Sequence, residues 1–457
     1  MFFKNKIIRN RPFYILNRFK NKQIIKNFSL SNLHISDNEF TPLIDFDPSP
    51  EIMKNYKKYI DLNIDRSELK NIQENKIKLL IQKSGDPKID KISLADAYSF
   101  LSNINDFKRE LKDINKFILE KISQDEENKL KELSEYNFLM MGKMIRPVLI
   151  ILVSKYIHEC KINMLNLSDP TLKKKILISD SVDIETEDFF KSKKFNQIVK
   201  PFAACVEVVH NASLLHDDII DNSNERRSRK TAHNIYGIRE TVFSANFIIS
   251  KAANVIIDLD YKHLSQIYSG IVLKLTEGEC QQSLKISNLK NLDESFYVYM
   301  HKTYYKTASL LALSLRGVGI IYDLNVEYQK KLFDLGLHLG LVFQLVDDVL
   351  DVLYDSVKIQ KPALKDLKEG VINSHILYEC IFSDEMLELA SRKFKGEKDI
   401  EKAVEILNKG LGILKTENLA MDHLLDSVNI ISDEFFIDNQ TKKDLFRCFH
   451  YLIKRCY

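Results

Sequence analysis

The sequence has few of the residues that interrupt helices. Its 457 residues include only 13 glycines and 9 prolines, which favours long helices and few tight turns. It has no uninterrupted apolar run long enough to cross a bilayer. Its six cysteines form no CxxC pair and show no metal-ligand spacing, so we expect reduced thiols in an intracellular protein.

Charge is nearly balanced over the whole chain but not at its beginning. A formal net charge of +3 is too small to suggest nucleic-acid binding, and 45% hydrophobic with 29% charged residues is typical of a soluble globular protein. Residues 1–36, however, contain eight Lys or Arg and no Asp or Glu, and the basic residues alternate with apolar ones. This composition predicts a mitochondrial transit peptide. A basic tail on a cytoplasmic protein is the alternative.

The rest of the chain divides by composition. Residues 37–87 are mixed and charged, and Pro42, Pro48 and Pro50 indicate a linker or an N-terminal extension. Residues 88–457 show helical periodicity, which predicts one helical domain. Within this domain, residues 161–198 are rich in Lys, Asp and Ser and lack a clear period, so we expect a surface insertion there.

Apolar residues recur at helical spacing through most of this domain. Residues 95–122 place them at i, i+3, i+4 and i+7, the stripe of an amphipathic helix. Another helix is expected to begin after Pro147. Alternating strand patterns are scarce, so we predict an all-α fold with further helices at residues 202–222, 239–258, 263–284, 292–317, 326–355, 373–382, 386–395, 399–408, 412–427 and 442–455.

Two apolar runs are interrupted by aspartates at the same spacing. In SLLHDDIID (residues 213–221), Asp217 and Asp221 are four residues apart, so they share one face of a helix. The same DDxxD spacing returns in LVFQLVDDVLD (residues 341–351). One such cluster is weak evidence, because acidic clusters on exposed helix faces are common. Two clusters among residues that should be buried indicate bound cations, because an unpaired carboxylate out of water is costly.

Hard oxygen ligands on two facing helices suit Mg²⁺, which keeps waters and shares its coordination with substrate phosphates. We therefore predict that Mg²⁺ and diphosphate are held by Asp217, Asp218, Asp221, Asp347, Asp348 and Asp351. Each nearby cation alone has the simpler interpretation of a solvated surface charge. Together they bracket both acidic clusters, as a site for two diphosphates requires; they are Lys143, Arg146, Arg226, Arg227, Lys306 and Lys361.

The ordered motifs of residues 88–457 resemble those of the trans-polyprenyl diphosphate synthases, in particular the long-chain enzymes that make octaprenyl, solanesyl or decaprenyl diphosphate. Agreement of seven motifs in family order is not expected by chance. The motifs are SEYNFLMMGKMIRP, EVVHNASLLHDDIIDNSNERR, EGECQQ, KTYYKTASLLALS, GLVFQLVDDVLD, KPALKDLKEG and GILKTENLA.

This resemblance implies an antiparallel helical bundle around a central cavity, the isoprenoid synthase fold. It implies a Mg²⁺-dependent prenyltransferase that joins isopentenyl diphosphate head to tail onto farnesyl or geranylgeranyl diphosphate, for the side chain of ubiquinone. It also implies a homodimer, with a heteromer as the alternative, and peripheral membrane contact during product release. The departing diphosphate would act as the base, so no catalytic Ser, Cys or His is needed.

The resemblance also implies roles for individual residues. Catalytic roles fall on Lys306, Gln344 and Lys361. His210 either binds substrate or is a satisfied core histidine, and His216 would only orient a carboxylate. Substrate-binding roles fall on Lys143, Arg146, His210, Arg226, Arg227, Lys306, Thr307, Gln344 and Lys361.

The sequence departs from the family pattern at several places. None of the departures removes a predicted metal ligand or a diphosphate-binding cation, but they put loop geometry and rate in question and make a partner subunit conceivable. The departing residues are Met141, Ser228, Ala245, Asn246, Gln360 and the segment VINSH at residues 371–375.

Small residues precede the first DDxxD, where the family's growing chain is accommodated. Ala212 and Ser213 stand where a short-chain enzyme would have a bulky plug, and Phe202 is the first aromatic residue upstream. From Ala204 to Asp217 is roughly 20 Å along a helix. These residues favour a long product, which the family resemblance puts at about eight to ten isoprene units. Close helix packing is the alternative explanation for their size.

Three other functions stay open at this point. A geranylgeranyl diphosphate synthase would need a plug from another helix. A regulatory subunit of a heteromeric synthase would be expected to lose its acidic clusters, and both are intact here. A terpene cyclase or squalene-type synthase would not need GKMIRP, the element that serves isopentenyl diphosphate.

Overall fold

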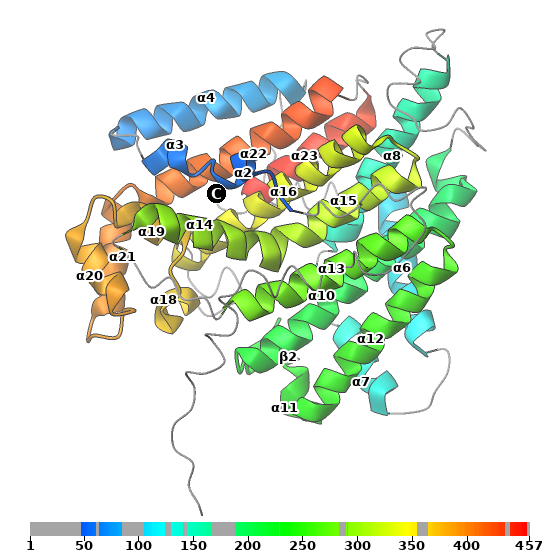
Figure 1. Cartoon of the computed structure of the whole chain (residues 1–457), viewed down its shortest axis with the longest axis horizontal. Helices are drawn as coiled ribbons and strands as arrows, with labels where there is room; N and C mark the ends of the chain where they lie inside the picture. Colours follow the sequence, from blue (N-terminus) through cyan, green and yellow to red (C-terminus); the bar gives the residue numbers. More distant parts are fainter. Residues whose placement is uncertain are drawn as a thin grey trace, which may run out of the picture. The chain divides into compact units, whose positions relative to one another are not determined.

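Helices dominate the computed structural model, which describes residues 47–60, 64–84, 105–123, 129–139, 142, 144–166, 188–227, 229–282, 289, 291–353, 364–434 and 439–454. The predicted all-α fold is confirmed by the elements in these ranges (Figure 1). Within them, strands pair only in a short antiparallel hairpin of β1 (Glu225–Arg226) and β2 (Arg229–Lys230).

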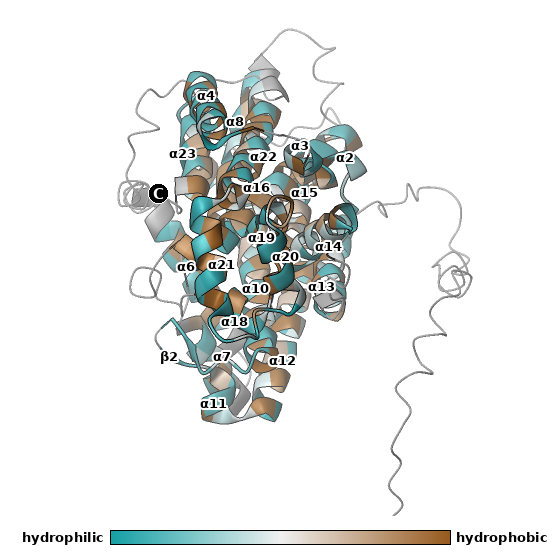
Figure 2. Cartoon of the chain, turned by 90° about the vertical axis from the view of Figure 1, so that its left-hand side faces the viewer, coloured by the Kyte–Doolittle hydropathy of each residue, from teal (hydrophilic) through white to brown (hydrophobic). Residues whose placement is uncertain are grey.

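Three long helices form the centre of the bundle: α10 (Lys200–Ile220), α15 (Ser309–Ile321) and α16 (Val326–Leu353). Every residue of α15 is buried. A short turn joins α15 to α16 and the two helices pack along each other, so they run antiparallel. Figure 2 shows hydrophobic residues concentrated on such central helices, whereas α20 (Asp384–Ser391) on the outside is mostly hydrophilic.

Two glycines let α16 approach its neighbour closely. A Cβ on Gly336 would lie 2.4 Å from the carbonyl oxygen of Leu311, and one on Gly340 would lie 2.4 Å from the Cα of Ala308. The two glycines are one helical turn apart, so they present one face to the same partner. This close contact fixes the position of α16 about two turns before its DDxxD.

Other helices surround this centre. On α10 packs α12 (Ile238–Asp258), and on α15 packs α13 (Lys262–Gln282). The remaining elements between residues 105 and 308 are α6 (Asn105–Ser123), α7 (Lys129–Leu139), α8 (Ile145–Asn166), η3 (Phe189–Lys191), η4 (Phe195–Val199), α11 (Ala232–Tyr236), α14 (Leu292–Thr303) and η5 (Tyr304–Ala308). Those at the C-terminal end are α18 (Lys365–Glu369), α19 (Ser374–Glu379), α21 (Asp399–Lys409), α22 (Gly412–Glu434) and α23 (Gln440–Lys454).

The N-terminal helices α2 (Pro50–Met53), α3 (Lys57–Ile60) and α4 (Arg66–Ser84) belong to the same compact unit. Tyr59 donates a hydrogen bond to Asp422 on α22 (2.5 Å), and the ammonium of Lys76 lies 2.6 Å from the same carboxylate. Burial lowers the pKa of Lys76, and Asp422 opposes this shift. A part of the region predicted as linker or extension therefore covers α22 with a buried ionic network.

The predicted helices agree closely with the observed ones, with two informative differences. Helix α8 begins at Ile145 rather than after Pro147, because a proline in the first turn removes an N–H that has no helical partner. The helix expected at residues 292–317 is split by the π-turn η5, which contains Lys306 and Thr307. Such π-turns often occur at functional sites.

Two compositional expectations bear on the core. Residues 195–220 have the length and mean hydropathy of a membrane-spanning helix, but 72% of the apolar window is buried in the bundle. The described part of the predicted insertion includes Phe189 and Phe195, and both are buried. Four cysteines are buried free thiols: Cys160, Cys205, Cys380 and Cys448.

Candidate functional site

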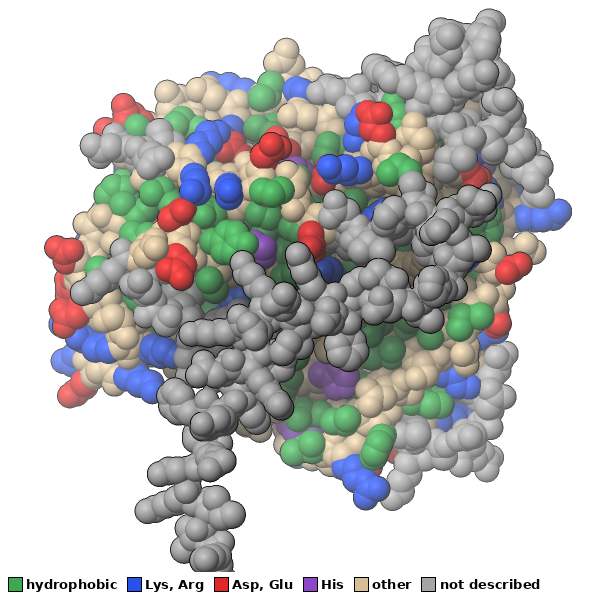
Figure 3. Space-filling view, viewed as in Figure 1, with side chains coloured by type: hydrophobic (Ala, Val, Ile, Leu, Met, Phe, Trp, Pro, Cys, Tyr) green, Lys and Arg blue, Asp and Glu red, His purple; other side chains and the backbone are tan. Residues whose placement is uncertain are grey.

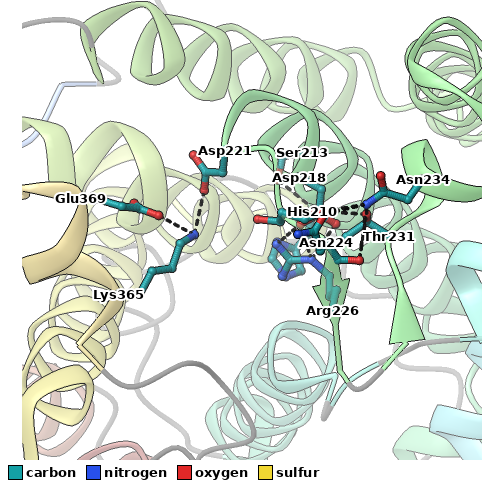
Figure 4. Close-up of polar contacts among 11 residues, drawn as sticks. His210, Ser213, Asp218, Asp221, Asn224, Arg226, Thr231, Asn234, Lys365 and Glu369 are labelled. Atoms are coloured by element: carbon teal, nitrogen blue, oxygen red, sulfur yellow. Dashed lines mark hydrogen bonds and ion pairs between the residues drawn. The ribbon is translucent and has the colours of Figure 1, made fainter.

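The first DDxxD lies at the end of α10, where the helix stops and the chain turns into the β1–β2 hairpin. Asp218 is buried and accepts three hydrogen bonds of 2.8 to 2.9 Å from the guanidinium of Arg226 on β1. Figure 4 shows this arginine reaching back from the hairpin to the helix. Asp217 and Asp221 are one turn apart and share another face of α10. Asp218, the second aspartate of this motif, thus already has its hydrogen-bond donors within the protein.

The electrostatic surroundings of Asp217 link α10 to η5. Burial raises the pKa of Asp217, and the positive charge of Lys306 opposes this shift. Asp221 raises the same pKa further, whereas Arg226 lowers it. A carboxylate whose pKa is raised by a neighbouring carboxylate is suited to a cation, which would relieve the repulsion between the two charges.

In the second DDxxD, Asp348 is buried among neutral donors. The hydroxyl of Tyr299 donates to it at 2.6 Å, and the amide of Gln344 donates at 2.7 Å. Thr307 on η5 in turn donates to the amide oxygen of Gln344 at 2.7 Å. Burial, together with the charge of Asp366, raises the pKa of Asp348 to about 8, although its two hydrogen bonds lower it. Gln344, which the resemblance gives a catalytic role, therefore connects Thr307 on η5 to Asp348 through two hydrogen bonds.

Helix α18 joins the two acidic motifs. The backbone N–H groups of Lys365 and Asp366 donate to the carboxylate of Asp351 at 3.3 and 3.1 Å. The ammonium of Lys365 lies 3.2 Å from Asp221 of the first motif. Figure 4 shows the two side chains pointing toward each other. The last aspartates of both motifs therefore lie within reach of one residue.

Three of the predicted substrate-binding residues, Arg146, His210 and Arg227, come together at α10. Burial lowers the pKa of His210 well below its usual value, and the positive charges of Arg146, Arg227 and Arg226 lower it further. A Cβ on Gly142 would lie 2.4 Å from the guanidinium of Arg227. The GKMIRP element therefore meets the arginine pair after the first DDxxD.

Some predicted residues lie outside the described part of the chain. Lys143 and Lys361 are among them, as are the departing residues Met141, Ser228 and Gln360. Among the remaining departures, Ala245 is buried and Asn246 is exposed on α12.

The structure adds four residues that the sequence reasoning did not single out. Glu207 is buried on α10, and the charges of Arg146 and Arg227 oppose the rise in its pKa that burial causes. Lys302 stands one helical turn before Lys306, a spacing that is visible in the sequence. Burial lowers the pKa of Lys302, and the positive charge of Lys306 lowers it further. The other two are Lys365, which lies inside the motif KPALKDLKEG without being singled out there, and Tyr299, which nothing local marks.

An apolar cavity lies upstream of the first DDxxD, between α6, α10 and α12. It is a small hollow that is partly open to solvent, and the space that a water-sized molecule can reach in it is about 20 Å³. Ala204, Cys205 and Val208 line it from α10, and Phe117 lines it from α6. Val208 stands roughly 13 Å along the helix from Asp217. Phe202 does not line this cavity; its ring points toward Gly317 on α15, where an added Cβ would lie 2.5 Å from it.

These features define a class of enzyme. The bundle is all-α and has the isoprenoid synthase fold. It holds two aspartate motifs beside a cluster of arginines and lysines. The first and last carboxylates of each motif suit a hard divalent cation. The chain belongs to the polyprenyl synthetase family, whose family model matches residues 127–407. It is a prenyltransferase.

Relatives of known name agree with this membership. Over 328 residues the chain is 28% identical to a prenyl transferase of Cyanophora paradoxa, which covers 72% of this chain and 90% of that protein. It is 30% identical over 305 residues to the mitochondrial solanesyl-diphosphate synthase 1 of Oryza sativa subsp. japonica, which covers 66% of each chain.

The fold agrees with solved structures. A polyprenyl synthase from Caulobacter crescentus CB15, complexed with calcium and isoprenyl diphosphate, superposes with a TM-score of 0.63 at 23% identity. The match covers 79% of this chain and 98% of that one. This likeness confirms the fold.

Proposed function

We propose that this enzyme is a long-chain polyprenyl diphosphate synthase that adds isopentenyl diphosphate units to an allylic diphosphate such as farnesyl or geranylgeranyl diphosphate. The observation that carries the proposal is the apolar cavity upstream of the first DDxxD, whose α10 wall is made of Ala204, Cys205 and Val208. A growing isoprenoid tail needs apolar space beside α10, and small side chains on this helix leave room for it. The named solanesyl relative supports the same conclusion.

The residues fit a divalent cation. Asp217 and Asp221 lie on one helical face, and Asp347 and Asp351 repeat this spacing on α16. We assign metal binding mainly to these four, because Asp218 and Asp348 are buried and already accept hydrogen bonds from other side chains, whereas the other four aspartates are at least partly exposed. Mg²⁺, when bound, would supply charge neutralisation for the departing diphosphate.

The chain's own cations would do the rest of the electrostatic work. Breakage of the allylic C–O bond leaves an allylic cation and a diphosphate, and Lys306, beside Asp217, is placed to stabilise the leaving group. Arg146, Arg227 and His210 would hold isopentenyl diphosphate, whose double bond attacks the cation. The new carbocation loses a proton to the departing diphosphate, which completes the step. Lys143 and Lys361 are assigned to the same two diphosphates by their place in the family motifs.

A second candidate product is geranylgeranyl diphosphate. The observation that favours it is Phe117, an aromatic ring from another helix that lines the cavity. If this ring closes the space, the chain would stop short. The two candidates differ in product length and share one chemistry.

The test is to incubate the full chain with labelled isopentenyl diphosphate, Mg²⁺ and farnesyl or geranylgeranyl diphosphate, and to size the dephosphorylated products by reversed-phase chromatography. The full chain is required because α3 and α4 cover α22. A long ladder supports the first candidate, and a stop at geranylgeranyl diphosphate supports the second. Substitution Val208→Phe should shorten the ladder and Phe117→Ala should lengthen it, while Val208→Ile serves as the conservative control. Bound but unconverted substrate would contradict both.

We also propose a homodimer that uses the outer faces of α12 and α13. The exposed positions Phe243 and Ile257 on α12, and Leu273 on α13, are large and apolar. Exposed positions on the same two helices include the uncharged Ser250 and Thr276, whereas the exposed charges of Asp258 and Lys262 stand at the turn between the helices. Figure 3 shows mostly hydrophobic and uncharged atoms over this region. Light scattering should give twice the chain mass, and Phe243→Asp with Leu273→Asp should give monomer; a monomeric wild type would favour a partner subunit instead.

For location, we propose import into mitochondria and a product that serves as the ubiquinone side chain. The basic, acid-free residues 1–36 support import, as does the mitochondrial rice relative. A fusion of these residues to a fluorescent protein should label mitochondria. A diffuse signal would favour the cytoplasmic alternative.

A further inference from the structure

Lys365 contacts both acidic motifs, although it was not among the predicted site residues. Its ammonium lies 3.2 Å from Oδ2 of Asp221, and its backbone N–H donates to Oδ1 of Asp351 at 3.3 Å. The side chains of Lys365 and Asp221 are 37% and 32% exposed, so solvent and ions can reach the pair.

The backbone that carries Lys365 is held firmly in place. The N–H of Leu364 donates to the carbonyl of Asp351 at 3.1 Å, and Leu364 has a left-handed backbone with φ of 59°. On the following turn, Asn373 donates to the carboxylate of Asp366 at 2.6 Å. Helix α18 is thus fixed to the end of α16, whereas the ammonium of Lys365 is at the end of a flexible stem.

A second partner for this ammonium stands on the same helix. Glu369, one turn further along α18, has its carboxylate 3.6 Å from the Lys365 ammonium. Figure 4 shows the lysine between Asp221 and Glu369. A small rotation of the stem would transfer the charge from one carboxylate to the other without moving the backbone.

A divalent cation and this ammonium compete for Asp221. A metal–oxygen bond of about 2.1 Å would place the cation beside an ammonium that itself lies only 3.2 Å from the same oxygen. Two positive charges at that separation repel each other strongly. One of them has to leave.

We propose that Lys365 is a tethered cation that neutralises Asp221 in the metal-free enzyme and that divalent metal displaces it toward Glu369. Lys365 therefore sets the metal concentration at which the first DDxxD becomes occupied. The inference rests on the proposed function only in assigning Asp221 to the metal site. It makes Lys365 a positioning residue rather than a catalytic one.

The test is to titrate the metal-free full chain with Mn²⁺, which takes the same oxygen ligands, and to follow free Mn²⁺ by electron paramagnetic resonance. Lys365→Gln should lower the Kd for Mn²⁺ by about two- to fivefold, the range expected for an ion pair exposed to solvent. Lys365→Arg keeps the charge and should stay near wild type. Lys368→Gln removes an equal charge from an exposed position on the same helix and should leave Kd unchanged.

Two results would overturn the inference. One is an unchanged Kd in Lys365→Gln; the other is an equal shift in Lys368→Gln, which would mean that only the general field matters. Far-ultraviolet circular dichroism checks that each variant is folded. Product analysis of wild type runs in parallel. Normal products with an unshifted Kd would reject the role of Lys365 and keep the proposed function, whereas a shifted Kd without products would do the reverse.

Discussion

The two DDxxD motifs have the same spacing but different surroundings. The first stands where α10 ends, and its middle residue, Asp218, is paired with the guanidinium of Arg226. The second stands inside α16, and its middle residue, Asp348, is held by the neutral donors Tyr299 and Gln344. An ionic partner keeps a carboxylate charged, whereas burial among neutral groups raises its proton affinity. The first motif therefore already has a positive charge beside its buried aspartate, whereas burial raises the pKa of Asp348 in the second motif to about 8.

The largest expected effect comes from the carboxylates that face the site in each motif. Asp217→Asn and Asp347→Asn should each lower kcat/KM by about 10²- to 10³-fold, because each removes charge that positions the metal and diphosphate. Steady-state assays with saturating Mg²⁺ measure this, with Asp384→Asn on the outer helix α20 as the control. A fall of less than tenfold in either variant would contradict its assignment as a metal ligand.

The next prediction compares the unfolding free energy lost when a buried aspartate loses an ionic partner with that lost when one loses a neutral partner. Arg226→Gln leaves Asp218 buried without its cation and should cost about 3 kcal/mol of unfolding free energy. Tyr299→Phe removes one hydrogen bond from Asp348 and should cost only about 1 kcal/mol.

Urea denaturation without metal compares these two variants. Tyr299→Phe keeps the ring and its packing, so it isolates the hydroxyl. Equal losses in the two variants would mean that the partners of the two middle aspartates do not differ as described.

The pH dependence of stability should also distinguish the motifs. With a folded-state pKa of about 8 and an unfolded value of about 4, Asp348 stabilises the metal-free protein fully below pH 4. This contribution is lost as the pH rises to 8. Relative to wild type, Asp348→Asn should therefore gain up to about 1.4 kcal/mol per pH unit between pH 5 and 8.

The measurement is the difference between the urea unfolding free energies of Asp348→Asn and wild type in EDTA at several pH values. Buried histidines act in the opposite sense: burial lowers the pKa of His375 to about 4 and that of His423 to about 3, so their contribution is lost as the pH falls below about 6.5. They are shared by both proteins and cancel. A difference that does not change with pH would refute the raised pKa of Asp348.

The smallest effect concerns the connection between η5 and α16. Thr307→Val removes the hydrogen bond to Gln344 and should raise the activation free energy by about 1 kcal/mol. Thr307→Ser keeps the hydroxyl and should retain activity. A double-mutant cycle combines Thr307→Val with Arg226→Gln. If the two effects are not additive, the change at Thr307 also reaches the Asp218–Arg226 pair, which would contradict a local role.

The positions of most helices could be predicted well from the hydrophobic pattern of the sequence. Periodicity located the helices because buried faces repeat every 3.6 residues, and the same argument placed Asp217 and Asp221 on one face. Breaks that depend on tertiary contacts could not be predicted. The π-turn at Lys306 packs on α16, a contact between distant parts of the sequence, and the N-terminal helices have polar partners about 350 residues away on α22.

The sequence by itself determined the all-α class, the family, and the paired acidic motifs, because these depend on residue type and local spacing. Only the tertiary structure decided which aspartates face the site and which are satisfied internally, because the partners Arg226, Tyr299 and Gln344 are brought to them by folding. It also decided that Lys365, 144 residues from Asp221 in the chain, reaches that carboxylate. Charges far apart in sequence influence each other only at short distance in space.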